Sequence, residues 1–237
     1  MGIDKNKCEC HDLAINKCRL ASAKHHLEGT YSTMKVAIIG AGNVGRALAT
    51  SITRVGHDVT IAARDPRHAR AAAEEIGATP AESNTAAVRG ADVVILAIPY
   101  LGAGEEVAAE IRDHVAGKAI VDVTNPVKAD YSGLATGDSS AAEELQKQLP
   151  EANLVKAFNT IFASNQANPT PEVDGYVAAD DPKAKRDVMS LVESMGFTPL
   201  DVGPLSSARF LEGMAFINIG LNAANGWSWT SAWRLER

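Results

Sequence analysis

Three glycines with a fixed spacing, Gly40, Gly42 and Gly45, carry the clearest chemical signal in this chain. They directly follow the apolar run 36–39 and open a stretch of helical periodicity. In such a strand, turn and helix, free backbone N–H groups and the positive end of the helix dipole point at one place, which suits a diphosphate. Gly40 permits the tight turn, Gly42 lets the backbone approach phosphate, and Gly45 allows close packing. The motif predicts a dinucleotide site; the alternative is a strand-to-helix turn without a ligand.

The end of the second predicted strand indicates which dinucleotide to expect. NAD enzymes commonly place a carboxylate there to bind the ribose hydroxyls, but this chain has Arg64. A guanidinium suits a 2′-phosphate, and Arg67 and His68 follow one helical turn later. Asp65 is the counter-evidence, although its place before a proline is typical of a helix N-cap. We therefore expect NADP(H) rather than NAD(H); the alternative for Arg64 is a solvated surface charge.

Candidates for the second substrate's site follow the other strands, because ligands of doubly wound sheets lie beyond the carboxyl ends of the strands. These candidates are Pro99, Tyr100, Asn125, Pro126, Asn159, Thr160, Pro204, Leu205 and Ser206. Each has a structural alternative: the prolines end strands, Tyr100 packs, and Asn125 forms a turn. Asn159 is harder to explain that way, because a buried amide without a partner is costly.

The chain shows no convincing acid/base constellation. After Met34 the histidines are His57, His68 and His114, none of which follows a predicted strand. Lys156 and Tyr176 lie inside predicted strands, and Tyr131 lies on a long loop. Oxidation of an alcohol needs a group that takes the hydroxyl proton. Hydride transfer between two bound redox cofactors needs only proximity and orientation, so it tolerates this absence.

These residues must be positioned by a sheet, because from residue 35 short apolar runs alternate with helical stretches. We predict strands at 36–39, 58–63, 93–98, 119–123, 154–158, 173–178 and 197–202, and helices at 44–55, 66–76, 105–115, 182–195 and 205–225. The predicted fold class is α/β, a Rossmann-type doubly wound, mostly parallel sheet with a helical C-terminal appendage. We expect an extension at 1–33 that is disordered, an NADP-binding domain at 34–203 and a helical segment at 204–237 packed on it.

Composition narrows the class of protein. The chain has 237 residues, 46% of them apolar, and a formal net charge of −6. An acidic balance argues against nucleic-acid binding. No apolar run approaches the roughly 20 residues of a membrane-spanning helix, and none in the first 33 residues resembles a signal peptide. We expect a cytoplasmic protein that acts on a small-molecule redox substrate and binds neither nucleic acid nor membrane.

The cysteines Cys8, Cys10 and Cys18 all fall in the first 33 residues, so the predicted fold uses no disulfide. Together with His11 they offer soft ligands, but they lack the Cys-x-x-Cys spacing of common zinc sites. We expect no metal site there; a small zinc site is the alternative.

Several segments together resemble a known family, the NADP oxidoreductases that depend on coenzyme F420, a deazaflavin hydride carrier. The likeness spans roughly residues 34–230. Its segments are Met-Lys-Val-Ala-Ile-Ile-Gly at 34–40, Gly-Asn-Val-Gly at 42–45, Arg64, Ala-Ile-Pro-Tyr at 97–100, Asp-Val-Gly-Pro-Leu-Ser at 201–206, and Arg209. The resemblance implies a homodimer in which the NADP pyrophosphate is held by Gly42, Asn43 and Val44. It further implies that Arg64 binds the 2′-phosphate and that Ile98 and Pro99 line the nicotinamide.

One segment departs from that family. Deazaflavin reductases tend to have a His-Thr-Ile-Pro run after the sixth strand, whereas residues 155–162 here read Val-Lys-Ala-Phe-Asn-Thr-Ile-Phe. This version is more similar to the NADPH-binding cytosolic domain of six-transmembrane metalloreductases, in which electrons pass to a flavin and then to metal. The departure falls where the second substrate should bind, so the electron acceptor is left open.

Three functional hypotheses follow. The leading one is hydride transfer between NADP(H) and a deazaflavin or flavin bound beside Pro99, Asn125 and Asn159. The second is reduction of a small imine or carbonyl, as in pyrroline-carboxylate reductases, which would need Lys156 or Tyr100 as proton donor. The third, from another class, is a protein that senses NADP without turnover.

Overall fold

The computed structural model describes residues 31–237, of which Thr33 to Arg237 form one compact unit. The segment 204–237 belongs to this same unit. The expectations for the extension, including the alternative of a zinc site at Cys8, Cys10 and Cys18, lie outside the described residues.

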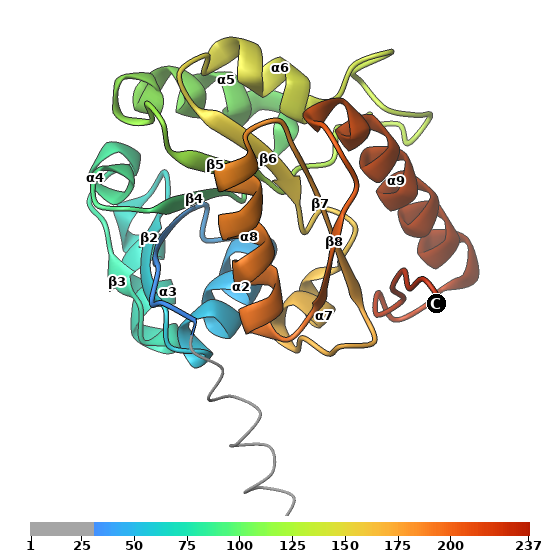
Figure 1. Ribbon diagram of the computed structural model, residues 1–237, viewed down its shortest axis with the longest axis horizontal. Coiled ribbons are helices and arrows are strands. Elements are labelled where there is room, and N and C mark those ends of the chain that lie inside the picture. The colour runs from blue at the N-terminus through green and yellow to red at the C-terminus, as the bar shows by residue number, and fades with distance from the viewer. Residues whose placement is uncertain (1–30) are drawn as a thin grey trace, which may run out of the picture. The chain divides into compact units, whose positions relative to one another are not determined.

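The centre of the unit is an eight-stranded sheet in the order β3-β2-β1-β4-β5-β6-β7-β8 (Figure 1). The chain adds strands on one side of β1 and then returns to add β4 on the other side, so a topological switch point lies between β1 and β4. In open α/β sheets this is the point where ligands bind. All pairings are parallel except that of β6 with β7. The predicted Rossmann-type, mostly parallel sheet is confirmed.

The elements follow the chain in this order: β1 (Lys35–Ile39), α2 (Asn43–Arg54), β2 (Asp58–Ala62), α3 (Pro66–Ile76), β3 (Thr79–Pro80), α4 (Asn84–Arg89), β4 (Val93–Leu96), α5 (Tyr100–Ile111), η1 (Arg112–His114), β5 (Ala119–Asp122), α6 (Ala141–Gln148), β6 (Asn153–Ala157), α7 (Ala163–Ala167), β7 (Asp174–Ala179), α8 (Pro182–Met195), β8 (Thr198–Asp201), η2 (Leu205–Ser207) and α9 (Ala208–Asn225). None of the helices in this part of the chain is long and apolar enough to cross a bilayer.

Helices cover both faces of the sheet (Figure 1). The core on one face is formed by β-strand side chains with α2, α3 and α8, and α7 packs beside α2. The core on the other face is formed with α4, α5 and α6, and α9 lies beyond α6 against β7. Buried apolar side chains on both faces explain why strands such as β4, Val93–Leu96, read as unbroken apolar runs.

Local signals set several helix ends where the sequence indicates them. The Asp65 side chain accepts a hydrogen bond from the Arg67 N–H at the start of α3, and Gly77 ends that helix with a φ of 79°. These contacts confirm Asp65 as a helix cap. The long helix α9 extends to Asn225 and ends at Gly226, again in the left-handed region.

The structure also contains elements that the sequence analysis does not predict. Short helices α4, α6 and α7 and the two-residue strand β3 fall in stretches read as loop or left unassigned. Helix α5 begins at Tyr100 rather than at residue 105, and the non-helical angles at Leu101 and Gly102 break its first turn. Short helices carry little periodicity, which is why they escape detection.

Candidate functional site

The glycine-rich turn is built so that two of its three glycines admit no side chain. Gly40 has a φ of 113°, and a Cβ placed there would lie 2.1 Å from the Ala97 carbonyl oxygen. A Cβ at Gly45 would lie 1.8 Å from the Gly40 oxygen. Packing of β1 and α2 against the segment after β4 therefore requires both glycines, in agreement with their predicted roles.

Packing within the protein does not require a glycine at position 42. It is the N-cap residue of α2, has an extended backbone and makes no side-chain cap, and a Cβ there would meet no atom within 4 Å. The first N–H groups of a helix have no partner inside the helix and form a ready site for an anion. Open space next to Gly42 therefore fits a phosphate held by the backbone at Asn43 and Val44.

A cavity of about 430 Å³ opens beside this turn at the switch point. It is lined by Gly40, Gly42, Arg64, Ser83, Asn84, Ile98 and Pro99, among others. The Arg64 side chain is 78% exposed, and its Nη2 lies 3.4 Å from Glu106 Oε2 of α5. An exposed pair at this distance is weak, so the guanidinium remains available to a phosphate. The structure thus places five of the predicted NADP residues around one cavity: Gly40, Gly42, Arg64, Ile98 and Pro99.

Arg67 and His68 are placed differently. The Arg67 guanidinium donates to both carboxylate oxygens of Asp65, at 3.1 and 2.7 Å, and this hydrogen bonding holds the pKa of Asp65 below its usual value. His68 is exposed in the first turn of α3. Arg64 is therefore the cation of this group best placed for the 2′-phosphate, because Arg67 already has a carboxylate partner.

Asn125 and Asn159 come together beyond β5 and β6. The Asn125 Nδ2 donates to the Asn159 carbonyl oxygen at 2.9 Å, and the Asn159 Nδ2 donates to Asn125 Oδ1 at 2.9 Å. The preceding residue, Phe158, has a φ of 61°, a rare conformation for a bulky residue that turns the chain sharply after β6. Gln166 of α7 stabilises this turn by donating to the carbonyls of Phe158 and Ile161.

A cavity of about 110 Å³ lies next to this amide pair. Its walls are the start of α2 at Val44, the loops after β5 and β6, and α9, which contributes Ala215, Asn218 and Ile219. None of the residues lining it carries a charge. The Asn159 Oδ1 is buried and has no hydrogen-bond partner. A buried hydrogen-bond acceptor is costly to leave without a donor. The Asn159 oxygen therefore points to a ligand with an N–H or O–H group.

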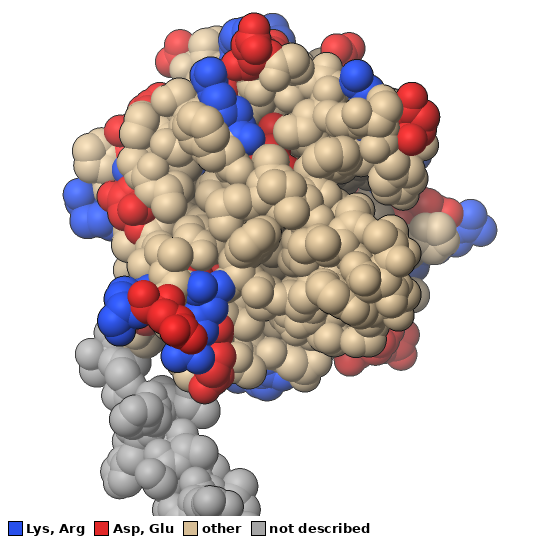
Figure 2. All heavy atoms as spheres, turned by 90° about the vertical axis from the view of Figure 1, so that its right-hand side faces the viewer, with Lys and Arg blue, Asp and Glu red and all other residues tan. Residues whose placement is uncertain are grey.

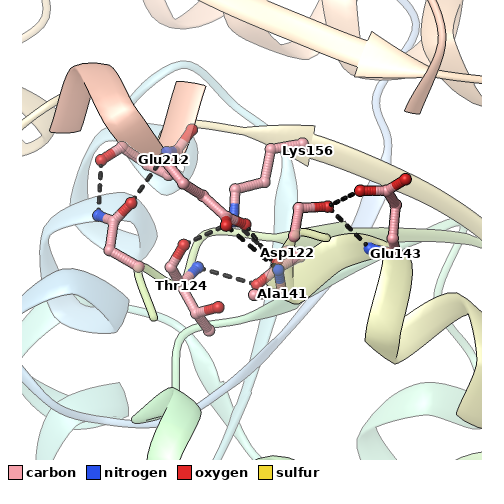
Figure 3. Close-up of polar contacts among 9 residues, drawn as sticks. Asp122, Thr124, Ala141, Glu143, Lys156 and Glu212 are labelled. Atoms are coloured by element: carbon pink, nitrogen blue, oxygen red, sulfur yellow. Dashed lines mark hydrogen bonds and ion pairs between the residues drawn. The ribbon is translucent and has the colours of Figure 1, made fainter. Parts of the chain in front are cut away.

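A buried ionic cluster lies beneath the same strand ends (Figure 3). Lys156 of β6 is fully buried, and its Nζ donates to Asp122 Oδ2 at 2.8 Å, to Glu212 Oε1 at 2.8 Å and to the Thr124 carbonyl at 2.6 Å. Glu212 of α9 also accepts from the Ala141 N–H at the start of α6. Burial raises the pKa of Glu212, opposed by the neighbouring ammonium.

This arrangement corrects one expectation from the sequence. Lys156 would serve as a proton donor in an imine reductase only if its ammonium met the substrate. All three of its N–H bonds are already directed at protein oxygens, and no part of the side chain reaches solvent. Lys156 is a structural cation and not an acid catalyst.

Tyr100 lines a separate cavity of about 370 Å³ between α5 and α6. Ile98 also lines it, so this cavity adjoins the one at the switch point. Burial, followed by the nearby carboxylates of Glu144 and Glu212, raises the pKa of the Tyr100 phenol. Tyr100 is therefore the remaining candidate for a proton donor beside the cleft.

Of the other residues predicted from the sequence for the second substrate's site, one lines a cavity described above and four do not. Thr160 lines the uncharged cavity beside Asn159, whereas Pro126, Pro204, Leu205 and Ser206 line none of the three cavities.

Four further residues at these sites were not predicted from the sequence: Asp122, Gln166, Glu212 and Asn218. Asp122 did have a usable signal, because it is a charged residue at the end of the apolar strand β5. Lys156 is likewise a charged residue in the next strand, β6. Buried charges must be paired, so the two could have been expected to meet.

A backbone anion site at a switch point, a cation beside it and an uncharged cavity next to it define a dinucleotide-binding oxidoreductase of the Rossmann class. Comparison with known proteins agrees. The profile of the family described as NADP oxidoreductase coenzyme F420-dependent matches residues 35–126. The F420-dependent NADP reductase of Methanothermobacter thermautotrophicus is 33% identical over 215 residues, covering 81% of this chain and 90% of that protein. The chain belongs to this family of NADP-dependent oxidoreductases, which confirms the expected enzyme class and the resemblance.

Two further relatives bear on the acceptor side. Metalloreductase STEAP3 of Rattus norvegicus is 33% identical over 183 residues, covering 75% of this chain but 36% of that protein. The chain thus spans about a third of the metalloreductase's length. A crystal structure described as a putative F420-dependent NADP reductase from Arthrobacter sp. fb24 has a TM-score of 0.78 at 28% identity, covering 86% of this chain and all of that one.

Proposed function

We propose that this protein transfers a hydride between NADP(H) and a deazaflavin or flavin acceptor bound beside Pro99, Asn125 and Asn159. Bound NADPH supplies the hydride from the nicotinamide ring, and the acceptor ring takes it up with a proton from solvent. The turn at Gly42 holds the pyrophosphate, and Arg64 holds the 2′-phosphate. Ile98 and Pro99 then face the nicotinamide. The names of the relatives, reductases that use F420 and metalloreductases, support this class of acceptor.

The observation that carries the proposal is the uncharged cavity with its unpartnered Asn159 oxygen. A volume of about 110 Å³ is below the roughly 150 Å³ of a cavity that takes benzene, so it admits one edge of a flavin or deazaflavin ring system and not the whole of it. Flavin and deazaflavin rings carry an N–H at one edge, which can donate to Asn159 Oδ1. The amide pair with Asn125 holds that oxygen in a fixed orientation, so the chain contributes position and leaves the chemistry to the two cofactors.

The test is anaerobic NADPH oxidation with coenzyme F420, FMN, FAD, ferric chelates and small imines as separate acceptors. We expect a rate with F420 or a flavin, and we expect Asn159→Ala to raise the KM for that acceptor about tenfold, the loss of one hydrogen bond. Asn153→Ala is the matched control, because Asn153 opens the same strand at its amino end and bonds to Gly117. Equal effects of the two variants would refute the proposed acceptor position.

A second candidate, reduction of a small imine or carbonyl, is favoured by one observation. The raised pKa of Tyr100 keeps its phenol protonated, as a proton donor requires, and the adjoining cavity of about 370 Å³ has room for a small substrate. The same acceptor panel separates the two functions. A rate with imines that Tyr100→Phe abolishes would favour the second.

We further propose that the working form is a homodimer, joined through α9. Figure 2 faces the side on which α9 lies, and its broad central area carries neither acidic nor basic side chains. Phe210, Ile217 and Leu221 project from α9 at helical spacing, and Phe210 is 70% exposed. A two-fold axis across this stripe pairs it with the same stripe of a second copy, which removes a large apolar patch from water.

Light scattering after gel filtration tests this dimer. We expect twice the chain mass of 24.9 kDa for the wild-type chain and a monomer for Ile217→Lys. Leu101→Lys on α5 is the matched control, because Leu101 and Ile217 are both 54% exposed. A monomeric wild type, or a dimer that survives Ile217→Lys, would refute the interface.

A further inference from the structure

The Lys156 ammonium joins three segments that are far apart in the chain (Figure 3). It bonds to Asp122 and Thr124 at the end of β5, and it bonds to Glu212 in α9 from its own place in β6. Each of its three N–H groups has one partner, so the geometry is complete without solvent. Removal of this one group would disconnect all three segments at that point.

In each of these segments, the residue that carries or contacts the ammonium is followed within one to three positions by a residue that lines the uncharged cavity. Thr124 is followed by Asn125, and Lys156 precedes Asn159 by three positions. Glu212 precedes Ala215 by three positions, about one helical turn. Asn125, Asn159 and Ala215 all line the cavity. The ammonium is therefore connected to the walls formed by the loops after β5 and β6 and by α9, but not to those formed by α2 and α7.

The geometry points to Lys156 as a positioning residue for the acceptor site. Held by Asp122, Thr124 and Glu212, it keeps the two asparagine loops and α9 in one fixed arrangement around the acceptor, without touching the acceptor itself. This inference rests on the proposed function for what the cavity binds. It adds that the acceptor half of the site depends on a buried cation, whereas the pyrophosphate turn of the NADP half depends on backbone atoms.

A useful variant must remove the ammonium without leaving buried charges. Lys156→Met alone would leave two carboxylates facing each other without a cation, and breaking a buried ion pair in this way strongly destabilises a protein. The triple variant Asp122→Asn, Lys156→Met and Glu212→Gln avoids this. It retains the acceptors for the Thr124 and Ala141 N–H groups, and it removes the ammonium's bonds to Asp122, Glu212 and the Thr124 carbonyl without leaving an unpaired charge.

The matched control is the double variant Lys185→Met and Asp201→Asn. Lys185 is also a mostly buried lysine, with its Nζ bonded to Asp201 at 2.9 Å and to the Gly203 carbonyl at 2.8 Å. Neither residue lines the cavity at Asn125 and Asn159. The control therefore removes a lysine–aspartate ion pair, more exposed than the Lys156 cluster, that serves another part of the fold.

Hydrogen–deuterium exchange of the full chain saturated with NADP⁺ tests directly whether the three segments stay ordered around the cavity. In the triple variant we expect exchange to become about tenfold faster in peptides covering 123–127, 158–163 and 213–219 and to stay unchanged around Gly42 and Val44. With the acceptor identified by the panel above, we expect kcat to fall about 100-fold, the typical effect of a displacement near 1 Å. The Kd for NADPH should stay unchanged, and the control variant should show none of these effects.

Two results would overturn the inference. One is unchanged exchange in all three peptides of the triple variant. The other is faster exchange throughout the chain, including the glycine-rich turn, which would mean that the cluster only stabilises the fold. The exchange measurement needs no acceptor. If no compound in the panel is reduced, the proposed function fails while exchange still decides the role of Lys156.

Discussion

Gly42→Ala separates binding from folding more cleanly than any other change in the turn. Gly42 has a φ of −80° and a ψ of −170°, angles that alanine adopts without strain. A Cβ there meets no atom of the protein within 4 Å. The added methyl group therefore disturbs nothing in the described structure and projects only into the space assigned to the pyrophosphate.

The expected effect on stability is close to zero. Alanine is a poorer N-cap residue than glycine by less than about 1 kcal/mol. It also restricts the unfolded chain, which stabilises the fold by about 0.4–1 kcal/mol. The expected effect on binding is much larger. Loss of one hydrogen bond to a charged group costs about 1.5–3 kcal/mol, which raises the Kd for NADPH about 10- to 100-fold.

Calorimetric titration with NADPH, together with urea unfolding, measures both quantities on the same protein. Gly90→Ala is the matched control, because Gly90 also has open space around its Cβ position and ends α4. Gly45→Ala should instead lower the free energy of unfolding, since its Cβ would lie 1.8 Å from the Gly40 oxygen. A Gly42→Ala variant that binds NADPH like the wild type would refute backbone recognition of the pyrophosphate at this turn.

Two further predictions concern single side chains. Arg64→Ala should weaken NADPH binding about 10- to 100-fold and NADH binding hardly at all, because the lost contact is a charge-assisted one to the 2′-phosphate. Arg67→Ala should weaken NADPH binding less, because the Arg67 guanidinium already pairs with Asp65. Equal loss of binding for both dinucleotides in Arg64→Ala would contradict this assignment. Burial lowers the pKa of His57 below 6.5, and its Nδ1 accepts a hydrogen bond from Met34, so the folded protein disfavours the protonated ring. The stability that this provides is present above about pH 6.5 and is lost as the pH falls through the lowered pKa, so urea unfolding between about pH 7.5 and about pH 5.5 should show a decline that His57→Gln reduces. An identical decline in the variant would contradict it.

The geometry of the glycine-rich turn was predictable because its signals are local. Gly40, Gly42 and Gly45 lie within six consecutive positions and belong to the same turn, so its local geometry accounts for all three. Asp65 likewise reveals its role through the proline that follows it and through the glycine that ends α3. Short-range rules of turns and caps suffice for such features, so the sequence indicated the main strands and the longer helices close to their observed bounds.

The proposed acceptor side was not predictable in the same way. Asn159 is positioned by Asn125 from one loop and by the Phe158 turn, which Gln166 of α7 stabilises. Glu212 reaches Lys156 across 56 residues of sequence. Neither pairing has a local pattern, and the positive φ at Phe158 cannot be inferred from a residue type that usually avoids it. The isolated charge of Lys156 in a strand was visible, but its partners were not.

Under the proposed function, the two halves of the site are held together in different ways. The turn that holds NADP depends on backbone atoms and on two glycines that packing requires, so side-chain changes elsewhere leave it intact. The acceptor cavity is framed by side chains from the ends of β5 and β6 and from α9 that meet at one ammonium. Under the proposed function, substitution at Lys156 or Asn159 is expected to change acceptor binding and to leave NADPH binding unchanged. The relatives at 33% identity include one named F420-dependent NADP reductase and one named metalloreductase.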